Sequence, residues 1–95
     1  MKIKLSTVMV DDQEKALKFY TDVLGFVKKT EIPMGDAKWL TVVSPEGPDD
    51  VELVLEPMGY PFARTNQKAL YEAGIPINAF AVDDIKNEHE RLEKN

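Results

Sequence analysis

The chain opens with side chains that alternate between the two sides of an extended backbone. Residues 2–10 predict a β-strand, because successive side chains of a strand point to opposite faces. The odd-numbered positions on one face are Ile3, Leu5, Thr7 and Met9. The other face carries two lysines, a serine and two valines.

Next comes a stripe of apolar residues at helical spacing. Leu17, Tyr20 and Leu24 fall on one side of a helix. The pair Asp11 and Asp12 can cap its beginning, because a carboxylate accepts hydrogen bonds from the first free backbone N–H groups. A glycine directly behind the stripe suits the left-handed residue that ends many helices. The sequence predicts a helix over residues 13–24.

Three more strands follow this helix. Residues 26–32 and 38–43 are rich in β-forming side chains and flank a turn at residues 33–36, so they predict a hairpin. Residues 51–56 alternate again until Pro57 ends the pattern. The predicted order is therefore β-α-β-β-β, and we expect no strands to pair in parallel.

The remaining residues predict a helix, a strand and a second helix. Thr65 or Asn66 can cap a short helix that runs to Ala73 after a Pro/Gly-rich connection. Residues 77–82 have the composition of a strand, and residues 84–94 repeat apolar side chains at helical spacing.

One junction occurs twice along the chain. Val10–Asp12 recurs as Val82–Asp84, an offset of 72 residues (82 minus 10). The first copy continues into three strands, whereas the second ends after its helix. We therefore divide the chain into a first unit over 1–57, a connection with a short helix over 58–76, and the beginning of a second unit over 77–95.

Composition and net charge limit which binding partners and which cellular compartment we expect. The net charge is −5 and basic residues do not cluster among aromatics, which argues against nucleic acid or an anionic membrane as partner. No apolar run approaches the length of a membrane span, and the N-terminus lacks the layout of a signal peptide. The chain has no cysteine, which fits a reducing compartment. We expect a cytoplasmic protein.

Several segments together carry a family pattern. They are Val10, Asp12, Phe19, Tyr20, Val23–Phe26, Trp39–Gly47, Val51–Pro57 and Val82–Ile85. Their order resembles the vicinal oxygen chelate superfamily, which includes glyoxalases, bleomycin-resistance proteins and extradiol dioxygenases. The resemblance implies an α+β fold, with a βαβββ module of the glyoxalase/bleomycin-resistance type followed by the βα start of a second, incomplete module.

The resemblance also implies a cup. In this superfamily two modules pack so that their curved sheets enclose the site for metal and substrate, and three strands of the second module are absent from the 95 residues. Unpaired strand edges can pair with another chain, so one expectation is a homodimer joined through sheet edges. The other, which we favour, is that the chain is part of a longer protein.

The metal positions implied by the resemblance are altered. Metal-dependent members carry a ligand, commonly His or Gln, at the positions that Leu5 and Ile77 occupy here. The family's carboxylate ligand matches Glu52, and Glu56 lies on the same face of the strand. Two carboxylates without imidazole are a poor set for a catalytic metal. We therefore expect no cofactor, and a divalent metal is the alternative.

The candidate ligand-binding residues lie on the predicted cup face and on the connection after it. They are Leu5, Thr7, Met9, Trp39, Glu52, Val54, Glu56, Tyr60, Phe62 and Arg64. Some of them have a structural alternative: Glu52 as a solvated residue of an edge strand or a partner for lysines, Trp39 as core or rim, and residues 60–64 as a loop held to the sheet by its own aromatics. Enclosure would make either glutamate a candidate general base or hydrogen-bonding anchor.

Three functions compete at this point. The first is a metal-independent module of the bleomycin-resistance type that binds a small molecule. The second is an enzyme, either a glyoxalase-like lyase or isomerase or a dioxygenase, that uses a divalent ion. The third is an interaction or folding unit with no activity of its own. No catalytic residue is identifiable, and His89, the single histidine, fits a packed or half-exposed helix position.

Overall fold

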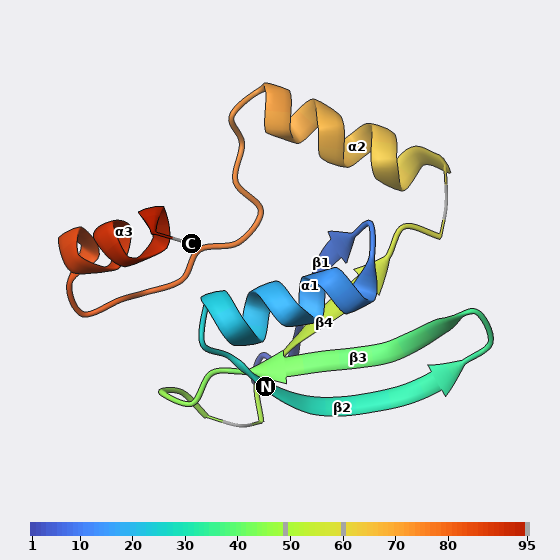
Figure 1. The fold of residues 1–95 in the computed structure, drawn as a ribbon. Coiled ribbons are helices and arrows are strands. Elements are labelled where there is room, and N and C mark those ends of the chain that lie inside the picture. The colour runs from blue at the N-terminus through green and yellow to red at the C-terminus, as the bar shows by residue number, and fades with distance from the viewer. Residues whose placement is uncertain (49, 60, 95) are drawn as a thin grey trace.

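The structure is a computed structural model that describes residues 1–48, 50–59 and 61–94. One sheet, a helix packed on it and two peripheral helices make up the fold (Figure 1). The elements in chain order are β1 (Leu5–Val10), α1 (Gln13–Lys18), the π-helical turn η1 (Phe19–Val23), β2 (Val27–Met34), β3 (Ala37–Val43), β4 (Glu52–Pro57), α2 (Pro61–Glu72) and α3 (Ile85–Glu93).

The four strands form one mixed sheet in the order β1-β4-β3-β2. The hairpin β2–β3 and the pair β3–β4 are antiparallel, as expected. The expectation that no strands pair in parallel is wrong, because β1 runs parallel to β4 with Leu5 opposite Glu52. In the chain, α1, η1, β2 and β3 lie between these two strands, and α1 provides the crossover that parallel neighbours need.

The helix α1 covers one face of this sheet and makes the core. Leu40, Val42 and Leu55 are at most 1% exposed beneath it. Half-buried apolar residues pack around these three: Val8, Val10, Ala16, Leu17, Tyr20, Phe26 and Leu53. The even-numbered valines of β1 therefore face the helix, and the odd-numbered residues face away from it.

The capping residue and the glycine that the sequence predicts at the two ends of the first helix are both found there. The side chain of Asp12 accepts hydrogen bonds from the backbone N–H groups of Glu14 and Lys15. After Lys18 the helix widens into η1, which carries the chain on to Leu24. Gly25 then adopts a φ of 86°, in the left-handed region that glycine enters without strain. The predicted helix over 13–24 is thus confirmed, with its last part in π geometry.

The second half of the chain departs further from prediction. Residues 77–82 do not form a strand; they run as an irregular segment, because no described strand pairs with them. Side chains hold the segment instead: Ser6 donates a hydrogen bond to Asn78 at 3.2 Å, and the rings of Phe26 and Phe80 meet edge-on with centroids 5.2 Å apart. Ser6 and Asn78 are 72 residues apart, the offset of the duplicated junction.

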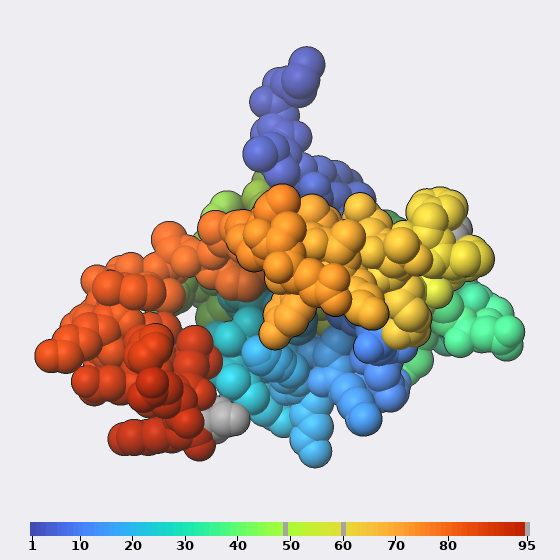
Figure 2. All heavy atoms as spheres, turned by 90° about the horizontal axis from the view of Figure 1, so that it is seen from above, coloured from blue at the N-terminus to red at the C-terminus, as the bar shows by residue number. Residues whose placement is uncertain are grey.

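The peripheral helices differ from prediction mainly in their beginnings. α2 begins at Pro61, a turn before the predicted caps, because proline is tolerated in the first turn of a helix. α3 is confirmed, and Asp84 caps it by accepting from the N–H of Asn87. Arg91 of α3 donates to the carbonyl of Val23 at 2.6 Å, which ties α3 to the end of η1. The residues before β1 project from the body of the molecule (Figure 2).

The core gives the first testable prediction. Replacing Leu55 with alanine removes a side chain that is 0% exposed and should lower the free energy of unfolding by about 3 kcal/mol, because it leaves a cavity under α1. Urea unfolding followed by circular dichroism measures this change. Ile85→Ala is the control, since Ile85 is 75% exposed; equal losses in the two variants would contradict the assignment of the core.

Candidate functional site

The face of the sheet opposite α1 gathers most of the candidate residues. Residues paired across neighbouring strands share a face, and the register pairs Thr7 with Val54, Thr41 with Val54, and Ile32 with Trp39. Seven of the ten candidates lie on this open face: Leu5, Thr7, Met9, Trp39, Glu52, Val54 and Glu56. Alternation along β1, β3 and β4 is sufficient to place them there.

A cavity of about 410 Å³ lies on the open face. Its walls come from β1, the hairpin, β4 and the segment after β4, and consist of Leu5, Thr7, Met34, Ala37, Lys38, Trp39, Val54, Glu56, Pro57 and Gly59. The described pairing between β3 and β4 is short, with Thr41 opposite Val54 and Val42 opposite Leu53. Trp39 and Glu56 lie two positions beyond the first of these pairs, where the two strands no longer pair, and the cavity forms there.

The side chain of Gln13 bridges β3 and β4 on the helix side of this gap. Its Nε2 donates to the carbonyls of Lys38 at 2.9 Å and Leu55 at 2.8 Å, and its Oε1 accepts from the N–H of Lys38 at 3.1 Å. These backbone groups would otherwise lose partners where the strands part, and such groups are costly to leave unpaired. Gln13 therefore stabilises the separation that shapes the cavity.

Glu52 is held in place by two hydroxyl groups of the same face. Thr41, which is 0% exposed, donates to Oε1 at 2.7 Å, and Thr30 donates to the same oxygen at 3.4 Å. Because β4 lies between β1 and β3, Glu52 occupies an inner strand of the sheet and is half-buried. Its alternative as a solvated residue of an edge strand is therefore wrong.

Glu56 is the carboxylate that lines the cavity. It is half-buried, and within the described part of the chain it has neither a hydrogen bond nor an ion pair. Trp39, which is 37% exposed, lines the same cavity. The site thus joins an aromatic surface with one unpaired negative charge.

Lys38 borders the cavity, but its ammonium group is engaged elsewhere. It forms ion pairs with Glu14 of α1 and, at 3.0 Å, with Glu31 of β2. The hydrogen bonds to Glu14 and Glu31 raise the pKa of Lys38, and hydrogen bonds from Lys28 and Lys38 lower the pKa of Glu31. These pairs lie on the side of the sheet that faces α1, because Lys38 is two residues from the buried Leu40 on β3 and therefore shares its face.

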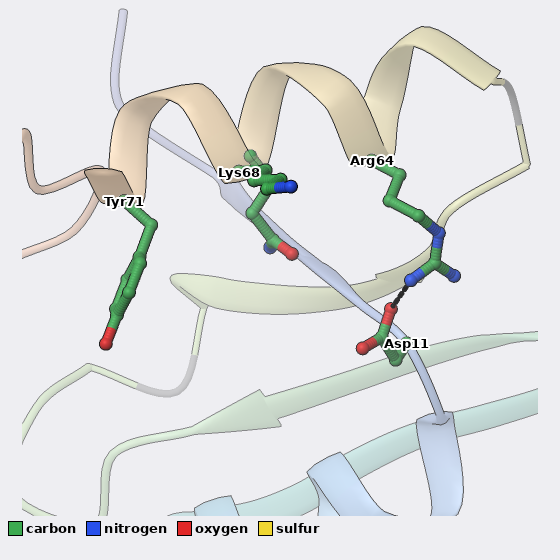
Figure 3. Close-up of a pocket in the computed structure, with 5 residues that line it drawn as sticks. Asp11, Arg64, Lys68 and Tyr71 are labelled. Atoms are coloured by element: carbon green, nitrogen blue, oxygen red, sulfur yellow. Dashed lines mark ion pairs between the residues drawn. The ribbon is translucent and has the colours of Figure 1, made fainter. Parts of the chain in front are cut away.

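A second cavity, of about 480 Å³, lies between α2 and the end of β1. Figure 3 shows Arg64 reaching down from α2 to Asp11, with the ion pair at 2.7 Å between Nη1 and Oδ1. The remaining lining residues follow Arg64 at helical spacing: Gln67, Lys68 and Tyr71. Sequence reasoning missed these three, although that spacing within one helix is the signal that groups them.

The structure separates the last three candidates from the open face. Arg64 lines the second cavity, and Phe62 is 69% exposed on the first turn of α2. Tyr60 lies outside the described residues. The expected irregular loop at 61–64 is helical instead, so Arg64 points along one side of α2 toward Asp11.

The donor set of the open face does not fit a catalytic metal. Among residues 1–48, 50–59 and 61–94, no group of three or more His, Cys, Asp or Glu side chains is placed to hold an ion. Leu5 occupies the open face where the resemblance implies a ligand, and Ile77 is 53% exposed. His89 lies on α3 with Nδ1 at 3.6 Å from Glu93.

Within the described helices, none is long and apolar enough to cross a membrane.

Comparison with known proteins assigns the fold to a family. Residues 2–95 match the Glyoxalase/Bleomycin resistance protein/Dioxygenase superfamily. The chain belongs to this superfamily. Its β-α-β-β-β module, with α1 on one face and the cavity on the other, is the part of the superfamily fold that the structure describes.

Relatives and solved structures agree with this assignment. The chain is 46% identical to YurT of Bacillus subtilis (strain 168) over 94 residues, which cover 99% of this chain and 74% of YurT. Its structure resembles UcmS2 with a TM-score of 0.79 and 29% identity, over 99% of this chain and 74% of UcmS2. It also resembles TnmS3, an antibiotic binding protein from Streptomyces sp. CB03234, with a TM-score of 0.66 and 26% identity over 99% and 69% of the two chains.

The bridge made by Gln13 gives the second testable prediction. In Gln13→Ala the N–H of Lys38 loses its acceptor, so its amide hydrogen should exchange about ten-fold faster and the variant should lose about 2 kcal/mol of stability. Hydrogen exchange followed by NMR measures the first effect. Gln67→Ala is the matched control, because Gln67 donates to the carbonyl of Met9 instead; unchanged exchange at Lys38 in Gln13→Ala would contradict the bridge.

Proposed function

We propose that the chain is a metal-independent module that binds a small molecule on the open face of its sheet. The observation that carries this proposal is the cavity of about 410 Å³, lined mainly by apolar residues with Trp39 and Glu56 among them. Small-molecule sites are concave and mostly apolar, with a few polar groups that orient the ligand. A flat apolar ligand would lie against the indole of Trp39, and Leu5 and Val54 would form the floor.

The superfamily contains both binding proteins and enzymes, so the donor set is the basis for choosing between them. An enzyme of the glyoxalase or dioxygenase kind uses a metal ion to polarise its substrate. Here Leu5 replaces an implied ligand, and Oε1 of Glu52 accepts from Thr41 and Thr30. The resemblance to TnmS3, an antibiotic binding protein, supports the binding role as well.

Trp39 gives the third testable prediction. It is the single tryptophan, so its emission reports on the open face. The neutral probe 9-anthracenemethanol should quench that emission by energy transfer, and Trp39→Ala should weaken binding about ten-fold in equilibrium dialysis, because the flat contact surface is lost. Tyr71→Ala, at the second cavity, should leave binding unchanged.

Two results would contradict the proposed function. One is that the probe does not bind, or binds equally well to Trp39→Ala. The other is a stoichiometric amount of iron, manganese, zinc or nickel in protein purified without chelator, because a resident metal would favour the enzyme. Metal analysis of the purified protein decides the second point.

We also propose that two copies associate along their sheet edges. The chain exposes 7396 Å², about a third more than the roughly 5,500 Å² expected of a compact monomer of this mass. β1 lies at the edge of the sheet, and no described residue pairs with its outer side. A strand edge with free backbone groups can add a strand of another chain.

Association gives the fourth testable prediction. Sedimentation at micromolar concentrations should show a dimer, and Ser6→Lys should weaken it about ten-fold, because a lysine on an edge strand opposes pairing. Ser44→Lys adds the same charge in the loop after β3 and serves as control. A well-folded monomer in the unmodified protein would contradict this proposal and would leave the binding role open to its own test.

A further inference from the structure

We infer that the ligand of the open-face cavity carries a protonated amine beside its flat apolar part, and that Glu56 binds this amine. The inference rests on the proposed function and names the chemical class of the ligand. It depends on the negative charge of Glu56 in the cavity, and on the ion pairs that Lys38 and Arg64 form with carboxylates outside it.

Glu56 presents the negative charge. It extends from β4 on the same face as Val54, is half-buried and has no partner within the described residues. A carboxylate next to an apolar wall is partly removed from water, which strengthens its attraction for an opposite charge. A hydrogen-bond donor with a positive charge is therefore the group that satisfies it best.

The positively charged side chains near the cavity form ion pairs with carboxylates other than Glu56. Lys38 pairs with Glu14 and Glu31 on the helix side of the sheet. Arg64 pairs with Asp11 at the second cavity. No other lysine or arginine lines the cavity within the described chain, so nothing there favours an anionic ligand.

Two further features favour a cation. Glu52 lies on the same face four residues before Glu56, so a second carboxylate faces this side of the sheet. Trp39 lines the same cavity as Glu56, and the face of an indole attracts an ammonium group in addition to packing against a flat ring. The cavity volume of about 410 Å³ falls within the range of about 300 to 1,000 Å³ that is usual for small-molecule sites.

Three anthracene probes with the same ring and different charges test the inference. They are 9-(aminomethyl)anthracene, which is a cation near neutral pH, the neutral 9-anthracenemethanol and the anion 9-anthracenecarboxylate. Equilibrium dialysis at low ionic strength should show that the cation binds at least ten-fold more tightly than the anion. The neutral probe should bind with intermediate affinity.

Variants then assign the preference to one residue. Glu56→Gln should weaken binding of the cation about ten-fold while leaving the neutral probe within about two-fold, which also shows that the variant is folded. Glu46→Gln removes the same charge from the exposed turn after β3 and should leave the preference intact.

The outcomes separate this inference from the proposed function. Equal binding of the three probes, or equal effects of Glu56→Gln and Glu46→Gln on the cation, would overturn the inference and leave the binding role standing. If no probe binds, the proposed function fails together with it.

Discussion

The fold depends on the packing of α1 against one face of the sheet. Leu40, Val42 and Leu55 are buried beneath that helix, and side chains alternate along each strand. Their neighbours Trp39, Thr41, Val54 and Glu56 must therefore face the opposite way. A slip of one residue in β3 or β4 would exchange the two sets. The hydrophobic core thus determines which side chains the open face presents.

Polar contacts then give the open face its shape. Gln13 bonds to both strands from the helix side, at the point where β3 and β4 separate. The hydroxyl of Thr41 holds Glu52 on the side where the strands still pair. The cavity lies beyond that pair and takes its wall from Trp39 and Glu56. The open face of this small module thus combines a flat aromatic surface with a carboxylate.

Local patterns in the sequence were sufficient for much of this architecture. Alternation placed Leu5, Thr7 and Val54 on one face, and the glycine at position 25 marked the end of the first helix. Long-range contacts were not accessible in the same way. The role of Gln13 depends on backbone groups 25 and 42 residues away. Residues 77–82 have a strand's composition, yet a strand also needs a neighbour to pair with, which composition does not reveal.

The central claim is that ligands bind the sheet face that α1 leaves uncovered. NMR of the protein with bound 9-(aminomethyl)anthracene tests it most directly, through contacts between protons of the probe and protons of assigned side chains. The account predicts nuclear Overhauser contacts from the anthracene ring to the indole of Trp39 and the methyl groups of Val54. Contacts to Tyr71 at the second cavity, or to Leu17 on the side of α1, would contradict it.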